Sequence, residues 1–170
     1  MLDRDVVRGA VGFSAVGVAA FSVWAFGRFR DEIVLYAATA AVFLGLSGLL
    51  LFPLAGGLRR FYLTFVPAFL AYAAVWSFAY LAWRTRLAEW LASAAGCAAF
   101  AVVLGLRSPA WIPRIAVVLF LTHSAGYFLG GDLYEALKGT AGRLLWGLSY
   151  GLGFGAGLGY AYRSIRPRPR

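Results

Sequence analysis

Asparagine and glutamine are absent from the 170-residue chain, and cysteine, histidine and lysine each occur once. The single cysteine, Cys97, cannot form a disulfide within the chain, and no cluster of Cys and His has the spacing of zinc ligands. One histidine cannot provide both axial ligands of a haem. We therefore predict no metal site and no cofactor. The lack of heat-labile amides is typical of a thermophile, but a biased base composition or the avoidance of amides in lipid explains it as well.

Charged residues are also scarce, because Asp, Glu, Lys and Arg make up only 14% of the chain, against about 25% in soluble domains. The long apolar segments carry no Asp or Glu in their cores, which argues against proton or sodium coupling and against acidic cation filters. Phosphate-binding loops and nucleotide-binding fingerprints are missing too. The chain therefore lacks the usual signs of an ion-coupled or nucleotide-driven machine.

What the chain has instead is apolar length: it is 62% hydrophobic, with a mean hydropathy of +0.75. A spanning helix needs about 20 apolar residues. Charged residues, Gly and Pro separate the predicted spans, at about 9–27, 33–54, 61–83, 87–106, 110–130 and 143–162. The sequence thus predicts an all-α, polytopic integral membrane bundle of six transmembrane helices, forming a single membrane domain over residues 1–170. Asp3 and Asp5 are unusual in a signal peptide, so the first span is expected to be retained.

The connection from Gly131 to Gly142 is the longest one predicted. Within it, Asp132 and Glu135 have the D-x-x-E spacing of a capping box, which predicts a new helical turn beginning at Leu133. A ligand site at these two carboxylates is the alternative.

The distribution of basic residues predicts the orientation. Ten of them fall at the termini and in the second and fourth connections, and six fall in the other connections. The positive-inside rule then places both termini in the cytoplasm, as in a multi-pass protein of the cell (inner) membrane. The tail from Arg163 to Arg170 carries four arginines, which favours an anchor on anionic lipid headgroups over a partner-docking motif. Basic residues confined to loops do not favour a nucleic-acid partner.

Glycine recurs every fourth residue in the last span, at Gly147, Gly151, Gly155 and Gly159. Such a GxxxG row allows another helix backbone to approach closely, either within this chain or in a homo- or hetero-oligomer. Aromatic residues form rows beside the glycine row and in the span 61–83, where Tyr72, Trp76 and Tyr80 recur every fourth residue. These rows predict either bulky aromatic side chains that face lipid or a pocket lined by aromatic rings.

The most informative polar cluster is Thr122, His123 and Ser124, since an ionisable residue near the middle of the bilayer is a candidate functional group. Helical spacing puts His123 and Tyr127 on a face with small residues, so the imidazole is expected to point into the bundle. A histidine that only bridges two helices is the alternative to a ligand, relay or catalytic role. A serine hydrolase pairing Ser47 with His123 is disfavoured, because the two residues are predicted to differ in depth by about 10 Å.

These observations lead to three hypotheses. The first is a membrane protein that binds or passes a small or apolar molecule, and that forms part of a larger transporter. The second is a noncatalytic structural or assembly subunit that docks through its last helix. The third is an intramembrane enzyme that uses His123. The sequence favours a non-enzymatic role, with Thr122, His123, Ser124, Tyr127, Tyr72, Trp76 and Tyr80 as candidate site residues.

Overall fold

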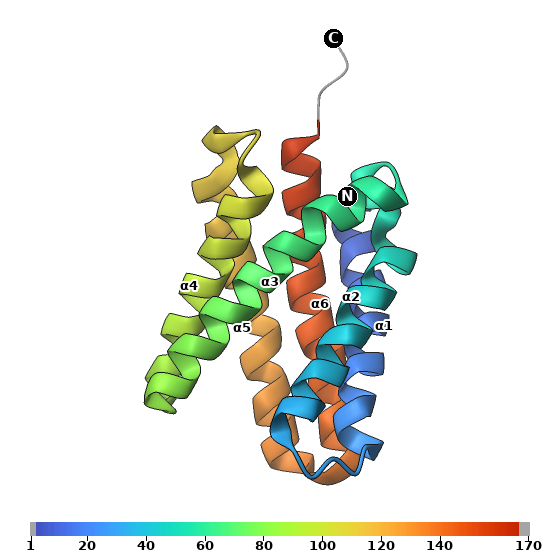
Figure 1. The fold of residues 1–170 in the computed structure, drawn as a ribbon, viewed down its shortest axis with the longest axis vertical. Helices are drawn as coiled ribbons and strands as arrows, with labels where there is room; N and C mark the ends of the chain where they lie inside the picture. Colours follow the sequence, from blue (N-terminus) through green and yellow to red (C-terminus); the bar gives the residue numbers. More distant parts are fainter. Residues whose placement is uncertain (1–2, 167–170) are drawn as a thin grey trace.

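The computed structural model describes residues 3–166, with only the backbone described for Glu32. Six long helices account for nearly all of this segment, and it contains no strand (Figure 1). The helices are α1 (Arg4–Phe26), α2 (Glu32–Ala55), α3 (Leu58–Trp83), α4 (Arg86–Gly105), α5 (Ile112–Leu137) and α6 (Gly139–Ile165), with a short 3₁₀ helix, η1 (Pro109–Trp111), before α5. The predicted all-α bundle is confirmed.

Five of the helices, α1 to α5, are long and apolar enough to cross a membrane. The remaining helix, α6, has 27 residues, but its glycines lower its hydropathy. It runs antiparallel to α1 along that helix, with Gly159 beside Asp5 at one end and Arg143 bonded to the Trp24 carbonyl at the other. Since α1 is itself long enough to cross the membrane, α6 extends over the same depth.

The interpretation of the last connection was wrong. Helix α5 continues through Gly130 and Gly131 to Leu137, so Asp132 and Glu135 lie inside a helix and cap nothing. Asp132 instead pairs with Arg86 at 3.4 Å, and Glu135 pairs with Lys138. The turn between α5 and α6 is centred on Lys138, whose φ of 52° lies in the left-handed region and ends α5 abruptly.

Glycine on α6 sits at two close helix contacts. A Cβ atom placed on Gly151 would lie 2.5 Å from the Phe13 carbonyl oxygen of α1, and one on Gly153 would lie 2.2 Å from the Thr122 carbonyl oxygen of α5. Real Cβ atoms do not approach a backbone so closely, so only glycine permits this spacing. The row that faces α1 is Gly147, Gly151, Gly155 and Gly159, and the row that faces α5 is Gly153 and Gly157.

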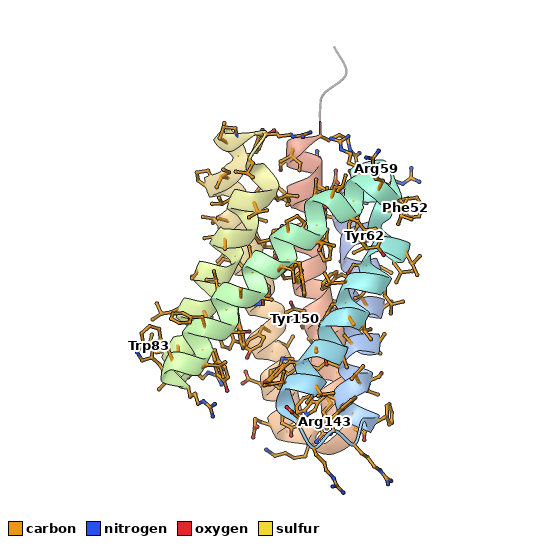
Figure 2. The ribbon with its side chains drawn as sticks, viewed as in Figure 1. Phe52, Arg59, Tyr62, Trp83, Arg143 and Tyr150 are labelled. Atoms are coloured by element: carbon orange, nitrogen blue, oxygen red, sulfur yellow. The ribbon has the colours of Figure 1, made fainter. Side chains whose placement is uncertain are left out.

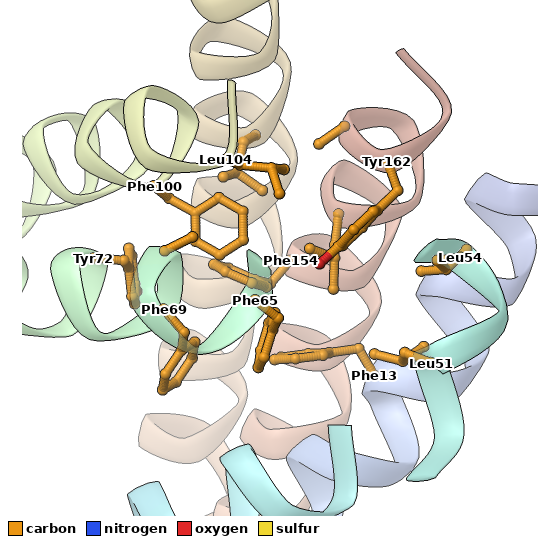
Figure 3. Packing of buried hydrophobic residues seen from close by; sticks show 14 of the residues in the cluster. Phe13, Leu51, Leu54, Phe65, Phe69, Tyr72, Phe100, Leu104, Phe154 and Tyr162 are labelled. Atoms are coloured by element: carbon orange, nitrogen blue, oxygen red, sulfur yellow. The ribbon is translucent and has the colours of Figure 1, made fainter. Parts of the chain in front are cut away.

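The bulky side of α6 faces α3, which crosses in front of it (Figures 1 and 3). Aromatic rings fill the space between these helices: Phe61 stacks on Tyr162 at 5.5 Å, and Phe69 meets Phe154 edge-on at 6.4 Å. The rings from α3 and α6 are buried together with Phe13 of α1 and Phe100 of α4. The buried members of the aromatic rows therefore form the core and do not face lipid, whereas Trp76 and Tyr80 are only partly buried.

The first two arginines of the basic tail are held against the bundle by ion pairs. Arg163 pairs with Asp3 at 2.7 Å and Arg166 pairs with Asp5 at 3.0 Å, which joins the end of α6 to the start of α1. Arg166 also donates to the Leu54 carbonyl at 3.0 Å. Two of the four tail arginines thus have carboxylate partners, and the other two, Arg168 and Arg170, lie outside the described residues.

Candidate ligand site

His123 lies on α5 and is completely buried at the centre of the bundle. Its Nε2 atom and the Tyr72 hydroxyl of α3 are 2.7 Å apart, so either the hydroxyl donates to the ring or the ring donates to the hydroxyl, depending on the tautomer. The other ring nitrogen, Nδ1, has no hydrogen-bond partner among the described residues. A neutral imidazole can donate at one nitrogen and accept at the other, so one hydrogen-bonding position of this ring remains unused.

Aromatic rings surround the imidazole. Tyr127, one turn along α5, stacks on it with centroids 5.7 Å apart and planes 11° apart, while Tyr150 and Phe154 of α6 meet it edge-on at 5.5 and 5.9 Å. Tyr150 and Phe154 thus bring α6 against the imidazole, and Tyr72 brings α3 against it. His123, Tyr72 and Tyr150 thus form a small polar centre inside an aromatic shell.

The two neighbours of His123 do not join this centre. Consecutive helical residues point about 100° apart, so three in a row cannot converge. The Thr122 hydroxyl donates to the Val118 carbonyl of its own helix at 3.0 Å, and its backbone faces Gly153 of α6. The Ser124 hydroxyl is buried without a partner within residues 3–166. Within the predicted polar cluster it is His123 that hydrogen-bonds to Tyr72 and stacks on Tyr127.

A cavity of about 560 Å³ opens beside this centre, at the end of the bundle opposite the chain termini. All six long helices contribute to its wall, and Tyr127 links it to His123 because the same side chain lines the cavity and stacks on the imidazole. Nine aromatic side chains make up most of the lining: Phe21, Trp24, Tyr36, Trp76, Tyr80, Tyr127, Phe128, Tyr134 and Trp146.

The aromatic wall is itself well packed. Trp76 stacks on Tyr80 at 5.1 Å and meets Tyr127 edge-on at 5.8 Å, and Trp146 stacks on Tyr134 at 5.7 Å. These contacts support the rings against one another. In the described part of the chain, the indole N–H groups of Trp76 and Trp146 have no acceptor, and both nitrogen atoms are themselves buried. The surface that the wall presents to the cavity is therefore mainly aromatic carbon.

Charged side chains occupy the mouth of the cavity. Arg86 and Glu89 come from the first turn of α4, and Glu135 comes from the last turn of α5. Arg86 lies over the Phe128 ring at 5.3 Å while it pairs with Asp132. The mouth is thus polar and the interior is aromatic, as expected for a site near the membrane surface.

Two other sequence candidates have no partner in this site. Ser47 is buried in α2, and its hydroxyl forms no hydrogen bond with any described residue, so the structure contains no Ser47–His123 pair. Cys97 is buried in α4 as a free thiol. In residues 3–166 no three His, Cys, Asp or Glu side chains are grouped as metal ligands.

Of the aromatic candidates named with His123, Tyr72 and Tyr127 contact the imidazole, and Trp76 and Tyr80 line the cavity together with Tyr127. The other six aromatic residues of the wall were not among the candidates. Trp24, Tyr36 and Tyr134 were not recognised, although all three lie close to helix ends at the same end of the bundle. Their common position near these helix ends could have indicated that they lie at the same depth in the membrane. No protein-family model, no curated protein and no solved structure matches this chain.

Proposed function

We propose that this protein is a multi-pass protein of the cell membrane that holds a small, largely apolar molecule in its aromatic cavity. The observation that carries the proposal is the cavity of about 560 Å³, which lies within the roughly 300–1,000 Å³ of small-molecule sites. Its wall is mostly aromatic, and its charged side chains, Arg86, Glu89 and Glu135, lie at the mouth. This combination is typical of a site for a flat or ring-containing molecule.

The composition of the wall indicates the class of ligand. Nine of the lining side chains are aromatic, and aromatic rings pack favourably against other flat rings. We therefore expect an aromatic or cyclic ligand.

Binding of a small molecule is better supported than its passage through the bundle. The rings of Phe65, Phe69 and Phe154 are buried and fill the middle of the bundle, so the cavity does not continue to the other end (Figure 3). A role as the membrane subunit of a larger transporter would require a second conformation in which this aromatic layer separates.

The positive-inside rule supports an orientation with both termini in the cytoplasm, which directs the cavity mouth away from it. Figure 2 places Arg59 at the terminal end and Arg143 at the other. Because the only native cysteine, Cys97, is buried, a cysteine appended after Arg170 provides a clean test. A membrane-impermeant maleimide should label it only after the cells are permeabilised. Labelling in intact cells would reverse the orientation.

Binding can be tested with the fluorescent aromatic amine N-phenyl-1-naphthylamine as a probe, using detergent-solubilised protein. Saturable binding with energy transfer from tryptophan is expected. Trp76→Ala and Tyr80→Ala remove the stacked pair from the wall, so each should weaken binding about tenfold. Trp83→Ala is the matched control, since Trp83 is 62% exposed and lies outside the cavity. Equal binding by all four proteins, or none that saturates, would refute the site.

An intramembrane enzyme that uses His123 is favoured by one observation, the unpartnered Nδ1 atom. The imidazole, however, does not line the cavity. In a holding protein His123→Gln should leave probe binding intact, because Gln can still bond to Tyr72. Loss of binding in His123→Gln with unchanged thermal unfolding would favour direct contact between His123 and the bound molecule.

An assembly subunit that docks through α6 has less support, because α1 and α5 already cover both glycine rows of that helix. A homo- or hetero-oligomer would form through other faces. Native mass spectrometry in a mild detergent reports both the oligomeric state and any retained small molecule. A retained molecule of low mass in the wild type, lost in Trp76→Ala, would support the holding role.

A further inference from the structure

A second and larger hollow lies at the end of the bundle that carries the termini. This groove of about 1,330 Å³ is formed where the start of α1, the α2–α3 turn, the end of α4 and the end of α6 meet. It is separated from the aromatic cavity by the buried core and shares no lining residue with it. We call it the terminal groove.

The terminal groove has an unbalanced positive charge. Its two acidic residues, Asp3 and Asp5, are already paired with Arg163 and Arg166. Within residues 3–166, its remaining arginines pair with no carboxylate: these are Arg4, Arg8, Arg59, Arg60 and Arg107. They come from three separate parts of the chain, so it is the fold that gathers them around one hollow.

The backbone adds to this positive potential. Helix α3 begins in the groove wall, and its N-cap, Gly57, provides no side-chain hydrogen bond. No acidic residue lies in its first turn, where Arg59 and Arg60 stand instead. The first amide groups of α3 and two arginines therefore face the same region without a counter-charge.

The inner wall of the same groove is apolar. Leucines from α3 and from the end of α4 remain exposed beside the arginines: Leu58 is 45% exposed, Leu63 65% and Leu106 69%. Pro53, Pro67 and Val103 extend this apolar surface. A small inorganic anion would leave it unused, whereas a lipid would cover it with its acyl chains.

We propose that the terminal groove binds the phosphate-bearing headgroup of an anionic membrane lipid. The five unpaired arginines and the start of α3 surround the phosphate, and the exposed leucines contact the upper part of the acyl chains. Basic pockets between transmembrane helices recognise anionic lipids by this arrangement of charge above apolar surface. This site is independent of the aromatic cavity and of the tail residues 167–170.

The test uses delipidated, detergent-solubilised protein titrated with phosphatidylglycerol and followed by native mass spectrometry. Phosphatidylcholine with the same acyl chains and sodium phosphate are the two comparison ligands. We expect phosphatidylglycerol to bind at least fivefold more tightly than phosphatidylcholine. Millimolar sodium phosphate should not displace it. Equal binding of the two lipids, or full displacement by sodium phosphate, would overturn the assignment to an anionic lipid.

The variant Arg59→Gln/Arg60→Gln removes two groove charges that are exposed and unpaired, so the fold should be unaffected. Phosphatidylglycerol should bind it roughly 30-fold more weakly, if each arginine contributes its usual attraction to anionic lipid. The control is Arg28→Gln/Arg30→Gln, which removes the same charge at the opposite end. It should bind within twofold of the wild type. Equal losses in both variants would show that net charge and not the groove attracts the lipid.

Discussion

Replacing Gly151 by alanine should weaken the bundle more than a single methyl group suggests. The new Cβ atom would lie 2.5 Å from both the Phe13 carbonyl oxygen and the Ser14 Cα atom of α1. Ordinary contact begins at 3.4 Å, so the methyl group is about 0.9 Å too close to two backbone atoms. Backbone cannot rotate away as a side chain can, and α1 must therefore move away from α6.

That movement has an energetic cost along the whole interface. A gap of 0.5–1 Å removes about a quarter to a half of the attraction between atoms in contact. Inside a membrane, van der Waals contact is the main force between helices, so water exclusion does not compensate. Overpacking of a close-packed site costs about 1–3 kcal/mol. We expect Gly151→Ala to lower the free energy of unfolding by about 2–3 kcal/mol, near the upper end of this range.

The matched control is Gly45→Ala in α2, because a Cβ atom on Gly45 would meet nothing within 4 Å. It makes the same chemical change in a helix with free space and should alter the free energy of unfolding by less than about 0.5 kcal/mol. Both variants can be unfolded by titrating sodium dodecyl sulfate into mixed micelles while circular dichroism is recorded. If Gly151→Ala and Gly45→Ala unfold at the same detergent fraction, the close backbone contact does not exist.

Three further changes test other parts of the fold by the same unfolding measurement. His123→Leu leaves the Tyr72 hydroxyl without its imidazole partner and should lower the free energy of unfolding by about 1–3 kcal/mol. The double variant His123→Leu/Tyr72→Phe should lose less than the two single variants added together. Strictly additive losses would argue against the hydrogen bond. Lys138→Gly should stabilise the protein by about 1 kcal/mol, because its φ of 52° and ψ of −177° favour glycine, and a loss of stability would show that this turn is not strained. Asp5→Asn should cost less than about 1 kcal/mol, since its partner Arg166 is partly exposed and keeps its bond to the Leu54 carbonyl; a larger cost would mean that the ion pair holds α1 and α6 together.

The helices could be placed from the sequence because charged residues stand where the apolar segments end. Asp31 and Thr85, for example, accept hydrogen bonds from the first turns of α2 and α4, so the local sequence determines where these helices begin. The end of α5 could not be placed in this way. We expected the glycine pair to end the helix, but Gly130 is needed where Trp146 approaches, Gly131 lies at ordinary contact distance from the same ring, and the helix continues through both.

The cavity wall was only partly predictable for a related reason. Periodicity indicates which side chains share a helix face, and it correctly directed His123 inward. It cannot indicate how two helices diverge. Helix α3 is tilted across the bundle (Figure 1). Phe61 of α3 packs on Tyr162 at one end, and at the other end Trp76 of α3 lines the cavity together with Tyr36 of α2. The tilt of a helix follows from its packing against all the other helices, so the periodicity of its own sequence does not predict it.

The single-residue turn at Lys138 has a consequence for how the protein enters the membrane during synthesis. Among the long helices of residues 3–166, α6 alone lacks a window that is apolar enough to cross a membrane by itself, so the insertion machinery is not expected to release it into lipid alone. Because Lys138 ties it directly to α5, the two can partition together as a helical hairpin, with Gly153 and Gly157 already against α5. The most weakly apolar helix thus reaches the bilayer with its α5-facing side already covered. Its other glycine row can then pack on α1, which is synthesised first.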